Sequence, residues 1–145
     1  MKKLITAIFV LSLSTASLAE EDHSHGHQAS GGQAGMTLNE GKKWKSDETL
    51  QKNMVQMHKQ FNVLNKLVES KRAKDGDYKT MVEVMDKSIA DIFKNCKLEP
   101  KADATLHVVL TELMSAKDKM KNQKTSIEGL TQARKGFNLF HEYFQ

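Results

Sequence analysis

The sequence predicts an all-α protein: an antiparallel up-down-up-down four-helix bundle, preceded by a signal peptide and a disordered arm. Three observations favour this fold class. Four consecutive stretches carry apolar residues at spacings of three and four, which is the period of a helix with one buried face. Short polar turns separate these stretches, and no stretch shows the signals of a strand or a hairpin. Since short turns join antiparallel neighbours, the four helices are expected to share one core.

Residues 1–19 are typical of a secretory signal peptide. Lys2 and Lys3 precede an apolar run at 4–13, and small residues occupy the cleavage positions up to Ala19. The apolar run is too short to span a bilayer. We therefore expect an exported protein with no membrane insertion once the signal is removed. Its expected location is the periplasm, with an extracellular destination as the alternative.

The next segment, 20–43, is rich in Gly, Ser, Gln and His and has few apolar residues, so we expect a disordered arm. It contains His23, His25 and His27 at alternate positions. Three imidazoles on a flexible backbone can converge on copper, zinc or nickel. The arm is therefore a candidate metal-binding segment, and a solubilising tail with incidental metal affinity is the alternative.

The bundle is expected over 44–145, and its first helix should begin at Ser46-Asp47-Glu48, where a cap residue precedes an acidic first turn. The stretch 71–77 is charged apart from Ala73 and Gly76, and it predicts the end of this helix, a turn and the next cap. The apolar residues of the first helix are Leu50, Met54, Met57, Phe61, Leu64 and Val68.

The second and third helices show the same rhythm on either side of a short break at 97–100. Pro100 suits the first turn of the third helix. The expected inward residues of the second helix are Tyr78, Val82, Met85, Ile89, Ile92 and Cys96. Those of the third are Ala102, Leu106, Val109, Leu113, Ala116 and Met120.

The fourth helix is predicted to open with a capping box formed by Thr125 and Glu128. Its apolar face consists of Leu130, Ala133, Phe137, Phe140 and Phe144. Gly129, Ala133 and Gly136 leave one side of this helix narrow, and each glycine costs about 1 kcal/mol of helix stability relative to alanine. A partner must therefore approach closely there, either the edge of a planar cofactor or a neighbouring helix.

Composition and motifs exclude several classes of function. Removing Lys2 and Lys3 with the signal lowers the net charge from +4 to +2, and no basic stripe is interleaved with aromatics, so we expect no nucleic-acid binding. There is no hydrolase nucleophile motif, no glycine-rich phosphate loop and no Glu-x-x-His pair on an inward face. We therefore expect a protein that is not an enzyme, with methionine, histidine and cysteine as its candidate ligands.

Met54 and His141 form the first candidate pair of ligands. In this topology the first and last helices are antiparallel neighbours, so a residue early in one lies level with a residue late in the other. His58, one turn after Met54, could add to a methionine and histidine copper patch. The other inward methionines are expected to be core residues.

Two stretches of the chain resemble the cytochrome b562 family of soluble periplasmic proteins. Leu50-Gln51-Lys52-Asn53-Met54 is similar to the first helix of that family, and 134–145 with His141 is similar to its last helix. The resemblance implies a four-helix bundle that binds haem b without covalent attachment, through Met54 and His141. It also implies an electron carrier with a periplasmic redox partner.

A second resemblance favours a different function. The stretches 44–50 and 95–107 look like parts of a group of small exported bacterial proteins, which implies that Cys96 and His107 act together. A thiolate and an imidazole could supply half of a copper or zinc site, while a buried Cys96 and a His107 that caps a carbonyl are the alternative. Cys96 could also link a dimer; otherwise we expect a monomer. The alternative function is thus a cofactor-free copper- or zinc-binding or stress-related bundle protein.

Overall fold

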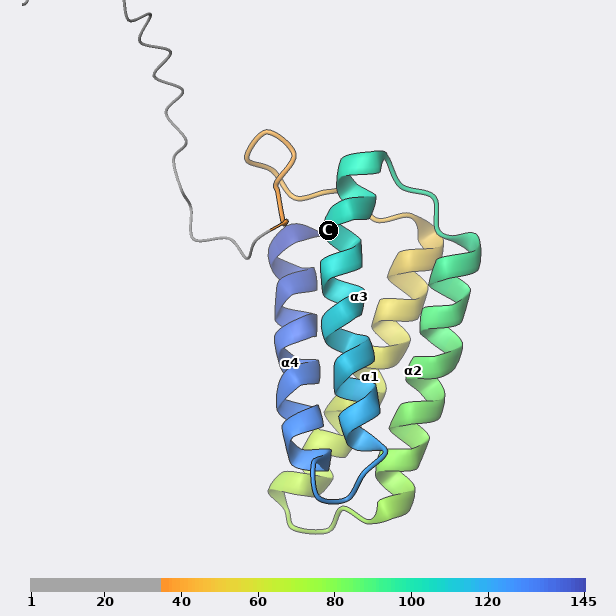
Figure 1. Ribbon diagram of the computed structural model, residues 1–145, viewed down its shortest axis with the longest axis vertical. Coiled ribbons are helices and arrows are strands. Elements are labelled where there is room, and N and C mark those ends of the chain that lie inside the picture. Colours follow the sequence, from red (N-terminus) through yellow and green to blue (C-terminus); the bar gives the residue numbers. More distant parts are fainter. Residues whose placement is uncertain (1–34) are drawn as a thin grey trace, which may run out of the picture. The chain divides into compact units, whose positions relative to one another are not determined.

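The computed structural model describes residues 35–145, and within them four helices form the bundle that the sequence predicts (Figure 1). They are α1 (Glu48–Glu69), α2 (Asp75–Asn95), α3 (Pro100–Met120) and α4 (Ser126–Tyr143). Each helix runs antiparallel to the one before it, which confirms the all-α fold class (Figure 1). The predicted signal peptide, and the part of the predicted arm that holds His23, His25 and His27, lie outside the described residues.

The starts of α1 and α3 carry the predicted signals, whereas the start of α4 does not. Asp47 is the N-cap of α1, and its carboxylate accepts a hydrogen bond from the backbone N–H of Leu50 at 2.7 Å. Pro100 is the first residue of α3, as predicted. At α4 the capping-box prediction is wrong, because the Thr125 hydroxyl makes no bond to the helix and instead donates to the backbone oxygen of Lys119 at 2.8 Å. That bond closes the turn between α3 and α4.

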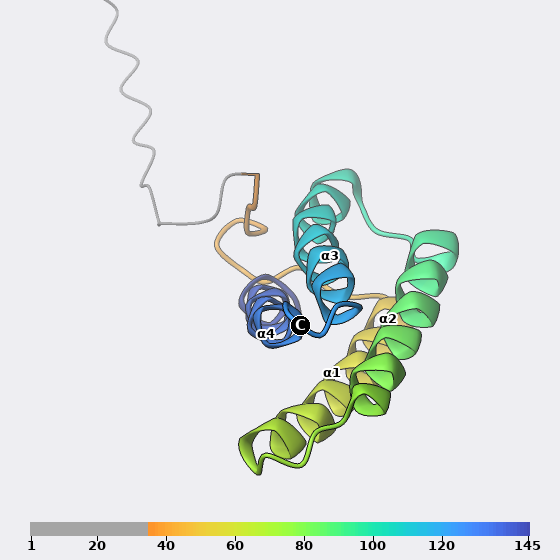
Figure 2. The ribbon, with the colours of Figure 1, turned by 60° about the horizontal axis from the view of Figure 1, so that its bottom comes forward.

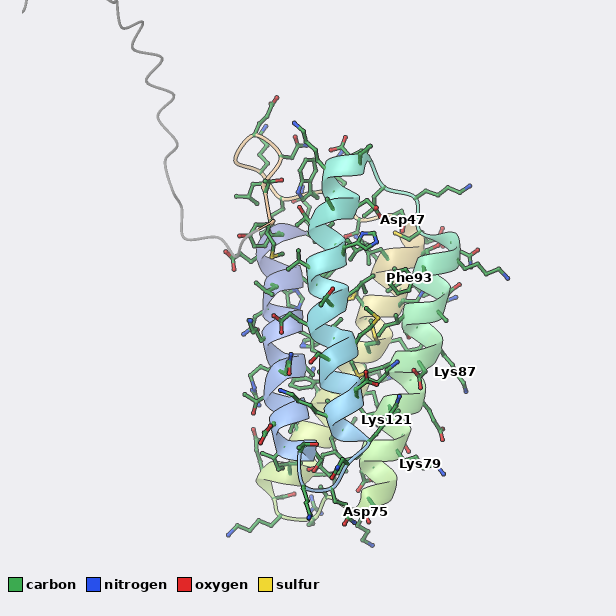
Figure 3. The ribbon with its side chains drawn as sticks, in the orientation of Figure 1. Asp47, Asp75, Lys79, Lys87, Phe93 and Lys121 are labelled. Carbon is green, nitrogen blue, oxygen red and sulfur yellow. The ribbon has the colours of Figure 1, made fainter. Side chains whose placement is uncertain are left out.

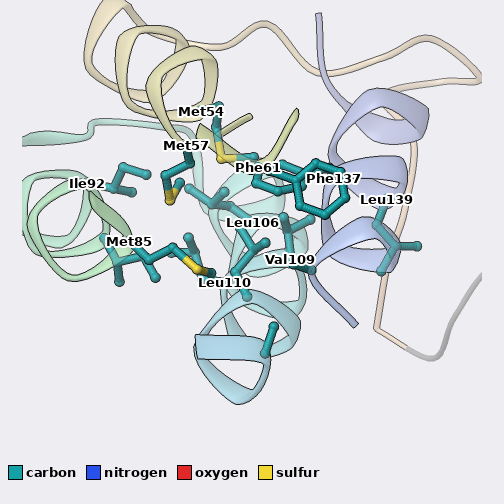
Figure 4. Close-up of a cluster of buried hydrophobic side chains, with 14 of the residues drawn as sticks. Met54, Met57, Phe61, Met85, Ile92, Leu106, Val109, Leu110, Phe137 and Leu139 are labelled. Carbon is teal, nitrogen blue, oxygen red and sulfur yellow. The ribbon is translucent and has the colours of Figure 1, made fainter. Parts of the chain in front are cut away.

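The four apolar faces meet in one core (Figure 4). The predicted inward positions are buried with four exceptions, since Val68, Tyr78, Cys96 and Phe140 are only partly covered. Further buried side chains include Met36, Trp44, Met81, Leu110, Leu139 and Tyr143. Burial of this apolar surface is the main force that holds the helices together.

The helices pair unequally: α1 lies against α2 and α3 against α4, while α1 and α4 touch at far fewer positions (Figure 2). Two glycines explain the close pairing of α3 with α4. A Cβ atom on Gly129 would lie 2.7 Å from the backbone oxygen of Ala116, and one on Gly136 would lie 2.8 Å from Cδ2 of Leu113. The narrow side of α4 therefore serves a neighbouring helix, the second of the two alternatives that the sequence left open.

Residues 36–46, here called the clasp, pack onto the bundle instead of belonging to a disordered arm that ends at 43. Met36 is 8% exposed and Trp44 is 3% exposed, so both join the core. Trp44 and Phe144 form a parallel bridge, in which the N–H of Trp44 donates to the backbone oxygen of Tyr143 at 2.8 Å and the N–H of Gln145 donates to that of Trp44 at 2.9 Å. The folded part therefore begins before the predicted boundary.

No helix within residues 35–145 combines the length and the apolar character that crossing a membrane requires.

Candidate functional site

A groove of about 320 Å³ lies between the start of α1 and the end of α4, where these two helices diverge. We call it the α1–α4 groove. Its lining is mostly apolar and aromatic, with one thioether and two imidazoles as the groups that can ligate a soft metal. The lining residues are Gln51, Met54, Val55, His58, Phe137, Phe140, His141, Phe144 and Gln145.

Met54 and His141, the two haem ligands implied by the family resemblance, line this same groove. Because α1 and α4 run antiparallel, Met54 near the start of α1 lies at the same height as His141 near the end of α4. Their environments differ, because Met54 is 2% exposed and belongs to the core, whereas His141 lies in the last turn of α4 and is exposed. A group bound here would therefore touch the core on one side and solvent on the other.

His58, which the sequence pattern indicated only as an additional donor beside Met54, lines the groove together with His141. Its ring centroid lies 5.3 Å from that of His141, with the two rings nearly perpendicular, and 5.0 Å from that of Phe137. Burial lowers the pKa of His58, and the neighbouring His141 lowers it further. A neutral imidazole is the form that binds metal ions.

Aromatic rings surround these donors. Phe61 and Phe137 lie with their centroids 5.1 Å apart, and Phe140 stacks on Phe144 at 5.4 Å with an interplanar angle of 7°. The rings of Phe140 and His141 meet edge to face at 5.7 Å. Phe137, Phe140 and Phe144 thus give the groove walls that are largely apolar.

The clasp holds the last turn of α4 in place beside the groove. The Lys43 ammonium donates a hydrogen bond to the backbone oxygen of His141 at 2.6 Å, and the Ser46 N–H donates to the backbone oxygen of Gln145 at 3.0 Å. Together with the Trp44 bridge, these bonds satisfy carbonyl groups that a helix end leaves without partners. The backbone that carries His141 is therefore tied to the segment that precedes α1.

Cys96 follows the last residue of α2 and has Asp47 beside it, and His107 lies in the first half of α3 with its ring centroid 6.2 Å from that of Phe93. Figure 3 labels Asp47 and Phe93. The Cys96 thiol donates a hydrogen bond to Asp47, and burial, the Asp47 charge and a smaller contribution from Asp103 raise its pKa to about 12. His107 is exposed, and its Nδ1–H donates to the backbone oxygen of Asp103 at 2.9 Å. Each side chain has partners of its own, so a shared metal ion stays a prediction that these contacts do not support.

A larger hollow, of about 460 Å³, lies at the opposite end of the bundle between the start of α2 and the end of α3. Its apolar lining comes from Tyr78, Val82 and Met120, and charged residues such as Lys79 and Lys121 surround it (Figure 3). It contains none of the predicted site residues and neither histidine nor cysteine. Its chemistry favours no specific ligand.

Across residues 35–145, no three side chains among His, Cys, Asp and Glu gather closely enough to hold a metal ion. A site with three ligands in this part of the chain must therefore include another donor, and the α1–α4 groove supplies the Met54 thioether. No family model, curated protein or solved structure matches the chain.

Proposed function

We propose that this protein is an exported carrier, not an enzyme, that binds a soft metal ion in the α1–α4 groove. The observation that carries the proposal is that Met54, His58 and His141 line one apolar groove. Thioether and imidazole are donors that suit copper, and imidazole also suits zinc. Export rests on the signal-like residues 1–19, and the periplasm is the location we propose.

Haem b is the second candidate, with electron transfer as the function. It is favoured by the position of Met54 and His141, which come from the first and last helices and line the same groove, as the b562 resemblance implies. When bound, haem would supply an iron whose reduction potential thioether ligation raises. The rings of His58 and Phe140 contact His141, so a macrocycle would have to displace them. A single ion requires no such displacement.

Analysis of metal and haem in protein purified from its own periplasm tests both candidates. We expect copper or zinc at close to one equivalent in a variant that lacks His23, His25 and His27, and loss of this metal in His141→Ala. Asn138→Ala is the matched control, because Asn138 is exposed on α4 and lies outside the groove. A red protein with the sharp absorption bands of six-coordinate haem, lost in His141→Ala, would replace the first candidate by the second. Protein with neither cargo would contradict both.

A further inference from the structure

We propose that the groove is a three-coordinate Cu(I) site formed by Met54, His58 and His141. This inference rests on the proposed function and names its cargo and its third ligand. His58 is the residue that a haem site would not use, so it distinguishes the two functions.

The spacing of the donors is the first argument. Met54 and His58 are four residues apart on α1, so their side chains lie on the same face one turn apart. His141 reaches the same place from α4, and its ring centroid lies 5.3 Å from that of His58. With metal–nitrogen bonds of about 2 Å, two imidazoles that share one ion have centroids roughly 5 to 6 Å apart. The distance between the two ring centroids is therefore within the range that a shared ion would give.

The charge of the site is the second argument. No Asp or Glu side chain lines the groove, and thioether and imidazole groups bring no negative charge to a metal ion. A divalent ion in this apolar setting would keep its full charge without a compensating carboxylate or thiolate, whereas a monovalent ion requires much less compensation. Structural zinc sites have four protein ligands, whereas the groove offers three. Thioether and imidazole donors in a low-charge site therefore favour Cu(I) over Zn(II).

The exposure of the donors is the third argument, and it concerns delivery. Met54 is 2% exposed, His58 is half-buried and His141 is exposed, so the donors form a series from the core to the surface. An ion held by these groups stays within reach of solvent through His141. An incoming ligand from a partner could replace His141 first while Met54 and His58 still hold the ion. This order of exchange suits a carrier that hands over its metal.

A competition titration tests the site. Cu(I) is titrated under anaerobic conditions against a coloured Cu(I) chelator, in protein whose His23, His25 and His27 are changed to Ala. We expect one equivalent of Cu(I) to bind, and we expect His58→Ala and His141→Ala each to weaken binding by about tenfold or more, since each removes one ligand. Asn138→Ala, at an exposed position of α4 outside the groove, is the matched control and should bind as the parent does. Circular dichroism of each variant establishes that the helices are retained.

Met54→Leu tests the thioether without emptying the core, because this exchange conserves volume. X-ray absorption of the Cu(I) protein should show a sulfur ligand that disappears in Met54→Leu. Tighter binding of Zn(II) than of Cu(I), or no effect of His58→Ala, would overturn the inference while leaving a metal carrier that depends on His141. Unchanged binding of metal in His141→Ala would overturn the proposed function as well.

Discussion

The two interfaces of α4 differ in almost every respect. Toward α3, Gly129 and Gly136 let the helices approach until an added methyl group would collide. Toward α1 there are far fewer contacts, and a groove is left in which His58, Phe140 and His141 are partly or fully open to solvent. One face of α4 is thus closely packed, and the other lines the groove in which we propose that metal binds. Substitutions should therefore separate stability from ligand affinity according to the face they alter.

The largest effect on stability is expected from Gly129→Val. The new side chain would collide with the backbone oxygen of Ala116, which lies 2.7 Å from the position of a Cβ atom, and with the backbone nitrogen of Met120 at 2.9 Å. Backbone atoms cannot rotate away, so overpacking should lower the free energy of unfolding by about 3 kcal/mol. Urea denaturation measures this loss. A variant as stable as the parent would show that α3 and α4 are not in close contact.

A smaller effect is expected from Gly136→Ala. The added methyl would meet Cδ2 of Leu113 at 2.8 Å, a flexible side chain, and the gain in helix propensity of about 1 kcal/mol opposes the strain. We expect a net loss of about 1 kcal/mol, measured by thermal unfolding. Gly76→Ala is the matched control, because nothing lies within 4 Å of its added methyl. It should be neutral or stabilising by about 0.5 kcal/mol.

The groove should make stability depend on pH through His58. Its pKa in the folded protein lies below the ordinary 6.5, so the unfolded chain binds the proton more readily. The stabilisation is present above 6.5 and is lost as the pH falls through the folded pKa. Denaturation from about pH 7.5 to about pH 5.5 should show a decline that is weaker in His58→Gln than in the parent. Burial is the larger cause of the shift, so His141→Ala should remove only part of this decline.

The smallest effect on stability is expected from His141→Ala. The side chain is exposed and its bond to Lys43 uses the backbone oxygen, which the substitution keeps. The free energy of unfolding should change by no more than about 0.5 kcal/mol. Loss of metal without loss of stability would then locate binding on this face. A large destabilisation would instead show that His141 is part of the packing.

Much of this arrangement could be predicted from the sequence. Helical periodicity located all four helices and most of the core, because each residue on the buried face of a helix must be apolar. The antiparallel order then placed Met54 and His141 at the same level. These predictions succeed because they depend only on the spacing of apolar residues along one helix and on the short turns that connect consecutive helices.

Other features depend on partners that spacing does not identify. Gly129 and Gly136 indicated a close contact, but only the folded chain shows that α3 makes it. The Thr125 hydroxyl was expected to accept a hydrogen bond from a helix N–H, but it donates one to the backbone oxygen of Lys119. Composition assigned Met36 to the arm, although it finds a place in the core. His58 is a candidate ligand because the ring of His141 on α4 lies beside it, and the pattern of α1 alone does not reveal this contact.

The bridge between Trp44 and Phe144 has a consequence for folding. It joins positions 44 and 144, so it closes a long loop of the chain and should form late. Until this bridge forms, the last turn of α4 lacks the backbone hydrogen bonds that secure it. We therefore expect the end of α4 that lines the groove to become ordered after the rest of the bundle.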